Sequence, residues 1–181
     1  MGPELAGEIA RRAEAFGFSH AGALDTATLK LRTEVRDMCA TDKCGKYNKS
    51  WMCPPACGEL AENTAKLRSY GWGVIVQTTA QLEDDFDIEA MQEASRRQGE
   101  LFVAFREELE RDYPGLLPLG SGGCTTCESC TYPDAPCRFP GKAMPSMEAF
   151  GLVVSDVCTD NGIPYYYGPQ TLTYTGCYLL A

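Results

Sequence analysis

The feature that most constrains this chain is a loop with four closely spaced cysteines. Cys124, Cys127 and Cys130 follow one another at intervals of three residues, and Cys137 comes after six further residues. Bacterial ferredoxin loops use the same interval to give the irons of one [4Fe-4S] cluster a thiolate each, although their fourth cysteine follows after three residues. Glycines within residues 120–123 let backbone N–H groups approach the cluster sulfides. The loop therefore predicts an iron–sulfur site.

Zinc is the main alternative metal for this loop. Zinc sites usually combine two CxxC pairs that are separated by a dozen or more residues, whereas here three thiols follow one another directly at this spacing. Iron–sulfur is therefore favoured over zinc, and both are favoured over plain thiols or disulfides.

A second group of cysteines precedes this loop in the chain. Its four thiols are Cys39, Cys44, Cys53 and Cys57. Gly45 and the pair Pro54-Pro55 supply turns that can fold the segment around one metal centre. The spacing is less diagnostic than that of the later loop. An iron–sulfur cluster is favoured over zinc and over the packing of buried thiols.

Composition limits the class of protein and its partners. The 181 residues, 44% of them hydrophobic, fit a single cysteine-rich metal-binding domain over residues 1–181. A net charge of −9, with no cluster of Lys or Arg, argues against binding to nucleic acid. The expected partner is a redox protein or a small molecule.

The cysteine count also bears on the compartment. The N-terminus has no basic segment followed by an apolar run, and no stretch is long enough to span a bilayer, so we expect a cytoplasmic protein with no membrane contact. Ten cysteines in a reducing compartment argue for metal or redox work. The single histidine, His20, is expected to be structural.

Hydrophobic periodicity predicts alternating helices and strands. Helices are expected over residues 4–16, 27–36 and 59–70, from the acidic run at 83–87 to about 111, and over 147–160. Strands are expected over 18–24, 72–79, 116–119, 163–167 and 171–180, the last two as an edge hairpin. The predicted fold is α+β or α/β, a mixed sheet of about five strands flanked by helices, with two cysteine-rich cluster-binding loops at one end of the sheet.

Cys158 and Cys177 stand outside both cysteine groups. Each lies within an otherwise apolar element, and a buried free cysteine behaves as a small hydrophobic residue. Packing is therefore favoured over metal ligation, with a redox pair as the alternative.

Several motifs together resemble one known family. They are Val35-Arg36-Asp37-Met38-Cys39, Cys44-Gly45-Lys46-Tyr47, Ser50-Trp51-Met52-Cys53-Pro54-Pro55, Cys124-Thr125-Thr126-Cys127-Glu128-Ser129-Cys130, Pro136-Cys137-Arg138-Phe139-Pro140 and Ser146-Met147-Glu148-Ala149. In these motifs the chain resembles the prokaryotic predicted metal-binding proteins grouped as domain of unknown function 2284, and the resemblance spans nearly the whole chain. It implies a metal or iron–sulfur protein of mainly anaerobic prokaryotes, without a settled reaction.

The resemblance also implies a set of ligands. By position it assigns the first group Cys39, Cys44 and Cys53, and the second group Cys124, Cys127, Cys130 and Cys137. In the family the fourth cysteine of the first group falls later, near Glu62 and Asn63 of this chain, and Cys57 is the candidate substitute. If Cys57 does not take that place, one iron lacks a protein thiolate and could bind substrate.

We therefore expect a protein that binds two [4Fe-4S] clusters through eight cysteines and serves electron transfer, or a redox accessory function, in anaerobic metabolism. A cluster with four thiolates has no open coordination site, so one-electron transfer is its natural use. Whether the chain turns over a substrate of its own stays open. One alternative is an enzyme that uses an open iron as a Lewis acid, in sulfur transfer or dehydration. The other is a zinc-stapled binding module.

Overall fold

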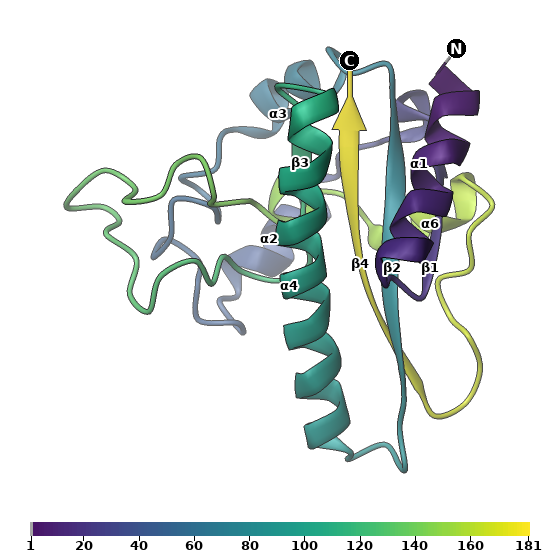
Figure 1. Cartoon of the computed structure of the whole chain (residues 1–181). Coiled ribbons are helices and arrows are strands. Elements are labelled where there is room, and N and C mark those ends of the chain that lie inside the picture. The colour runs from purple at the N-terminus through teal and green to yellow at the C-terminus, as the bar shows by residue number, and fades with distance from the viewer. Residues whose placement is uncertain (1) are drawn as a thin grey trace.

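The computed structural model describes residues 2–181, and its helices and strands alternate along the chain (Figure 1). In order they are α1 (Gly2–Phe16), β1 (His20–Leu24), the single 3-10 turn η1 (Thr26–Thr28), α2 (Thr33–Ala40), α3 (Leu60–Leu67), β2 (Trp72–Gln81), α4 (Ile88–Asp112), β3 (Leu117–Leu119), α5 (Met147–Phe150), α6 (Val154–Asp160) and β4 (Thr171–Leu180).

The four strands form one sheet in the order β1-β2-β4-β3, and all three pairs are antiparallel. The longest pair joins β2 to β4, from Trp72 opposite Leu180 to Gln81 opposite Thr171. The α+β class is confirmed. The sheet has four strands where about five were predicted, and it is antiparallel where a mixed sheet was predicted.

The missing strand is the one predicted over residues 163–167. Ile163 donates its N–H to the carbonyl of Cys158 as the chain leaves α6, and Pro164 has no N–H to give to a ladder. Tyr167 stacks instead on His20, with ring centroids 4.0 Å apart. As a result β4 is not half of an edge hairpin but an inner strand, paired with β2 on one side and β3 on the other.

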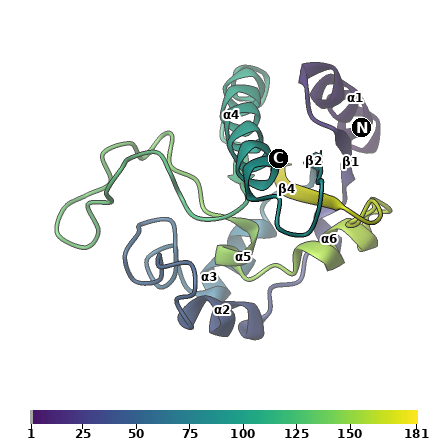
Figure 2. The same ribbon diagram turned by 90° about the horizontal axis from the view of Figure 1, so that it is seen from below.

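Helices cover both faces of the sheet (Figure 2). Val74 and Val76 of β2 pack into an apolar cluster with α1 and α4, while the intervening Ile75 packs into a second cluster with α3, α5 and α6. This alternation follows from the strand geometry, in which successive side chains point to opposite faces. The strands are therefore apolar on both sides.

Two helix predictions required correction. The helix predicted over 27–36 is replaced by η1 and by α2, which begins six residues later than expected, at Thr33. The helix predicted over 147–160 begins at the Ser146 cap as expected but is broken at Gly151, which has a φ of 101° and caps α5 by donating to the Glu148 carbonyl. A φ in this range favours glycine and ends a helix.

Both cysteine loops project from the same side of the molecule, beyond the edge strand β3 (Figures 1 and 2). The longer loop is closed at its base, where Gly120 donates to the Pro145 carbonyl at 2.9 Å and Met147 donates to the Gly120 carbonyl at 3.0 Å. The loops were predicted at one end of the sheet. They share one side as expected, but it is the lateral edge of the sheet.

None of the helices described within residues 2–181 is both long enough and apolar enough to span a membrane.

We expect Gly151→Ala to lower the free energy of unfolding by about 1–3 kcal/mol, because a residue with a side chain is strained in this left-handed conformation. A Cβ atom there would also lie 2.8 Å from Cδ1 of Leu60. Denaturant unfolding followed by circular dichroism measures the change. Gly141→Ala, at a loop position where a Cβ meets nothing within 4 Å, is the matched control. Equal stability of both variants would contradict this account of the break.

Candidate metal centre

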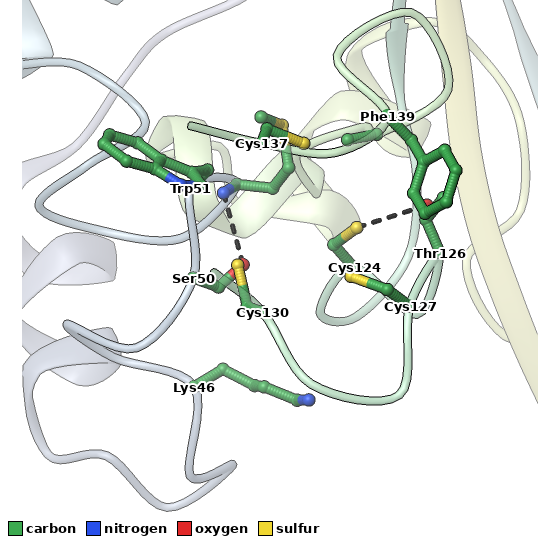
Figure 3. Close-up of a pocket in the computed structure, with 11 residues that line it drawn as sticks. Lys46, Ser50, Trp51, Cys124, Thr126, Cys127, Cys130, Cys137 and Phe139 are labelled. Carbon is green, nitrogen blue, oxygen red and sulfur yellow. Dashed lines mark hydrogen bonds between the residues drawn. The ribbon is translucent and has the colours of Figure 1, made fainter. Parts of the chain in front are cut away.

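The later cysteine loop gathers its four thiols around one cavity. Cys124, Cys127, Cys130 and Cys137 all line a space of about 20 Å³, and their sulfurs lie around it (Figure 3). The wall opposite the loop comes from the first cysteine segment, through residues 50–52 and Lys46. The loop has no helix or strand of its own, so side-chain and turn contacts set its shape.

Hydrogen bonds to its sulfur prepare Cys130 for ligation. Partial burial by itself raises the pKa of this thiol, but the backbone N–H groups of Tyr132, Trp51 and Thr131 and the Ser50 hydroxyl favour the thiolate, and the net effect lowers the pKa below its ordinary value. Donors of this kind stabilise a thiolate, which is the form that binds metal. Two of the donors, Ser50 and Trp51, belong to the first cysteine segment.

Further contacts hold the two cysteine segments against each other. The Trp51 indole N–H donates to the Ala135 carbonyl at 3.0 Å, and the Tyr132 hydroxyl donates to Oδ1 of Asn48 at 3.0 Å. The rings of Trp51 and Tyr132 meet edge to face, with centroids 4.9 Å apart. The two segments therefore form one structural unit, although more than 60 residues separate them in the sequence.

The first cysteine group lies between α2 and α3. Cys39 is on the last turn of α2, Cys44 is exposed in the following turn, Cys53 is buried, and Cys57 is partly buried just before α3. Burial raises the pKa of Cys53 most, the Ser50 hydroxyl lowers it, and the charges of Cys44 and Cys39 raise it further. Such mutual repulsion requires that the thiols lie near one another.

The short helix α5 packs against this first group and accepts hydrogen bonds from it. Arg36 on α2 donates to the carbonyls of Ala149 (3.1 Å) and Gly58 (3.0 Å), which joins α2, α5 and the turn after Cys57. The Cys57 thiol donates to the Ala149 carbonyl at 3.4 Å. Burial raises the pKa of Cys57 to about 11, although the nearby Arg36 charge opposes this. Cys57 is therefore held as a neutral thiol that faces the backbone of α5.

Two buried polar atoms beside the first group have no hydrogen-bond partner in the described chain. They are Oε2 of Glu148 and Nδ2 of Asn63. The Glu148 charge contributes to the raised pKa of Cys39, after burial and the charge of Cys44, so this carboxyl lies close to the thiols. Asn63 lies against the turn at Gly58, with Oδ1 2.9 Å from where a Cβ would stand. Unpaired buried groups are costly and commonly mark the place of a bound group.

The two cysteine groups adjoin. The charge of Cys124 contributes to the raised pKa of Cys53, so a thiol of the second group reaches the buried thiol of the first. Lys46 packs beside Gly123, where a Cβ would lie 3.1 Å from the lysine Cγ. The absence of a side chain at Gly123 therefore lets the two segments approach closely.

Within residues 2–181, no three Cys, His, Asp or Glu side chains are placed tightly enough to hold a single metal ion. All ten cysteines are free thiols. The thiols of the second group surround a cavity but do not converge on one point, as a tetrahedral zinc site with Zn–S bonds of about 2.3 Å would require. A donor set made of thiols fits a soft metal.

The remaining sequence candidates lie away from these loops. Cys158 and Cys177 are fully buried, and Cys177 belongs to the apolar cluster beneath the sheet, so the predicted packing role is confirmed. His20 stacks on Tyr167 at the β1 edge, which agrees with a structural role.

Three supporting residues were not identified from the sequence as part of either site. Arg36 and Glu148 reach the first group, and Ser50 reaches Cys130. Each lies within a motif that carries the family resemblance. That position within a motif was the only sequence signal, because neither periodicity nor spacing distinguishes them.

We expect Cys130 of the metal-free full chain to be alkylated at lower pH than Cys57. Only the thiolate reacts, and with its pKa at about 11 the Cys57 thiol is ionised to about one part in a thousand at pH 8. The pKa of Cys130 is lowered, so a larger fraction of this thiol is ionised and it should react at lower pH. Iodoacetamide labelling across a pH series, read by peptide mass spectrometry, measures both residues.

The control variant for this labelling is Ser50→Ala. It removes one donor to Cys130, so the labelling curve of Cys130 should move to higher pH while that of Cys57 stays in place. Identical pH profiles of Cys130 and Cys57 in the unchanged protein would contradict the assigned hydrogen bonds.

Comparison with known proteins agrees with this donor set. Searches of curated proteins and of solved structures found no match. A family model described as "Predicted metal-binding protein (DUF2284)" matches residues 22–180, which include both cysteine groups and all of the sheet except the first two residues of β1. The match confirms the family suggested by the motifs: the chain belongs to the DUF2284 family of predicted metal-binding proteins.

Proposed function

We propose that this protein binds two [4Fe-4S] clusters and serves electron transfer, or a redox accessory function, in anaerobic metabolism. The first cluster is assigned to Cys39, Cys44, Cys53 and Cys57, and the second to Cys124, Cys127, Cys130 and Cys137. Bound clusters would supply one-electron chemistry. The proposal includes a cytoplasmic location and a redox protein or small molecule as partner.

One observation carries the proposal. Four thiols from a single loop line one cavity, and the polar groups around one of them, Cys130, lower its pKa toward the thiolate form. The three-residue intervals between Cys124, Cys127 and Cys130 favour a polynuclear cluster over a single zinc ion.

The surrounding residues would then set the redox properties. The polar groups of Trp51, Tyr132 and Ser50 that favour the Cys130 thiolate would also withdraw negative charge from this ligand and raise the potential of a bound cluster. The charge of Cys124, from the second group, contributes to the raised pKa of Cys53 in the first. Clusters held by these two adjoining groups would exchange electrons over a short path.

We expect protein purified without oxygen to contain about eight iron and eight sulfide per chain, the content of two cubane clusters, and to absorb broadly near 400 nm. Cys127→Ser should lose about half of the iron, because it removes one ligand of the second group. Elemental analysis and sulfide assay give the counts. Cys158→Ala is the control, since this buried thiol lies outside both groups, and its iron content should not change. Zinc without sulfide would overturn the proposal in favour of a zinc-stapled module.

A second candidate function follows from the placement of Cys57. Its thiol donates to the Ala149 carbonyl and is held neutral, so the first cluster would have only three thiolates and one open iron. An open iron acts as a Lewis acid toward a substrate, as in sulfur transfer or dehydration. Glu148, whose buried Oε2 is unpaired within the described chain and whose charge contributes to the raised pKa of Cys39, is a candidate acid–base group.

Cys57→Ser separates the two candidates. If Cys57 is a ligand, the variant should lose the first cluster and about half of the iron. If the cluster has three thiolates, iron and sulfide should stay at the unchanged level, because the serine hydroxyl can make the same bond to Ala149. The result is measured by iron content and by the electron paramagnetic resonance spectrum of the reduced protein. Cys53→Ser is the matched control, and it should lose the first cluster in either case.

A further inference from the structure

A groove of about 930 Å³ runs between α4 and the beginning of the second cysteine loop. One wall is the α4 face that contains Gln98, Gly99 and Val103, and the other is the backbone of residues 120–126. Cys124 and Thr126 line both this groove and the cavity of the second cysteine group. The volume lies in the range of small-molecule sites, about 300–1,000 Å³.

Gln98 places an unused donor in the wall of the groove. Its side chain is 1% exposed, and its Oε1 accepts a hydrogen bond from the Thr78 hydroxyl at 2.5 Å. Its Nε2 is buried and has no partner in the described chain. A buried donor without a partner costs about 1–3 kcal/mol. An acceptor oxygen within hydrogen-bond reach of Nε2 would remove this cost.

Gly99 keeps the same wall open. It lies in the middle of the 25-residue helix α4, where glycine is about 0.8–1.0 kcal/mol less favourable than alanine. Packing does not explain it, since a Cβ at this position would meet nothing within 4 Å. A larger side chain here would project into the groove. The glycine therefore lowers helix stability and leaves space in the groove.

The other groups in the groove favour an anion with an apolar body. The backbone N–H groups of residues 121–123 make no hydrogen bond to the rest of the described chain, and the Lys142 ammonium makes no ion pair within it. Arg96 forms ion pairs with both Glu93 and Glu100, and Glu107 is exposed. Phe102, Val103 and Met144 supply apolar surface.

We propose that the groove between α4 and residues 120–126 binds a small organic carboxylate, with its oxygens toward Gln98 and the loop N–H groups and its apolar part against Val103 and Met144. Because Cys124 and Thr126 also line the second cysteine cavity, such a ligand would lie directly beside that site. The site needs only the fold, so it stands or falls independently of which metal the cysteines bind.

The test uses benzoate as a probe, since it joins one carboxylate to one apolar ring. The full chain, purified without oxygen with its bound metal, is titrated with benzoate while the ¹H–¹⁵N resonances are recorded. We expect saturable shifts of the Gln98 side-chain amide and of the Gly99 backbone amide. Benzylammonium, which has the same ring and the opposite charge, should cause none at these positions.

Gly99→Leu is the diagnostic variant. It should weaken benzoate binding at least about tenfold, or by about 1.4 kcal/mol, because the leucine side chain fills the groove. Its melting temperature should not fall, since leucine is a better helix former than glycine and meets no neighbour at the Cβ position. Gly7→Leu is the matched control on α1, where a Cβ meets only the end of Arg11 at 3.9 Å, and it should bind benzoate normally.

Three results would overturn the proposal: no saturable shift at Gln98 in the unchanged protein, equal affinity of Gly99→Leu and Gly7→Leu, or binding of benzylammonium as tight as that of benzoate. The metal and sulfide content of the same samples is measured separately. Failure of the carboxylate site and failure of the proposed cluster site can therefore be told apart.

Discussion

The two cysteine segments depend on each other because neither has a regular structure that could satisfy its own backbone. Residues 41–59 and 121–145 contain no strand and no α-helix, so their polar groups must pair with side chains, turns or each other. Trp51 makes the central contacts: its indole N–H donates to the Ala135 carbonyl and its ring meets that of Tyr132 edge to face. Removing either segment would leave the other without part of its hydrogen bonding.

Helices, strands and a few hydrogen bonds fix the ends of both cysteine segments. The second loop leaves β3 and returns to α5, and the Gly120 hydrogen bonds to Pro145 and Met147 close its base. The first segment leaves α2 and enters α3, and Arg36 on α2 donates both to the Ala149 carbonyl of α5 and to the Gly58 carbonyl at the far end of the segment. The four-residue helix α5 therefore touches both sites, and Gly151 determines where it stops. A continuous helix over 147–160 could not turn at this point.

Local patterns in the sequence were sufficient for much of the fold. The apolar β-branched run at 72–79 predicted β2, the acidic run followed by helical periodicity predicted α4, and Ser146 predicted the start of α5. Patterns failed where one residue or a distant contact decides the conformation. Gly151 breaks a segment whose periodicity reads as helix, and the stacking of Tyr167 on His20 replaces a strand at 163–167.

The candidate site was likewise predictable where it depends on local spacing and unpredictable where it depends on distant contacts. The spacing of Cys124, Cys127 and Cys130 was enough to group them, because residues this close in sequence share one loop. The approach of Cys53 to Cys124 could not be predicted, since it results from how β3, α5 and α2 pack in three dimensions. The groove beside α4 could not be predicted from the sequence either. Gln98 and Gly99 line it only because the loop at 120–126 lies opposite them in the fold.

The two apolar clusters that flank the sheet include none of the eight cysteines assigned to the metal sites. In a small zinc finger the metal replaces the hydrophobic core, and folding waits for it. In this chain the free energy of core formation comes from helices and strands alone. The apolar core of this scaffold is therefore built without the sulfur ligands, so core formation and metal binding draw on different parts of the chain.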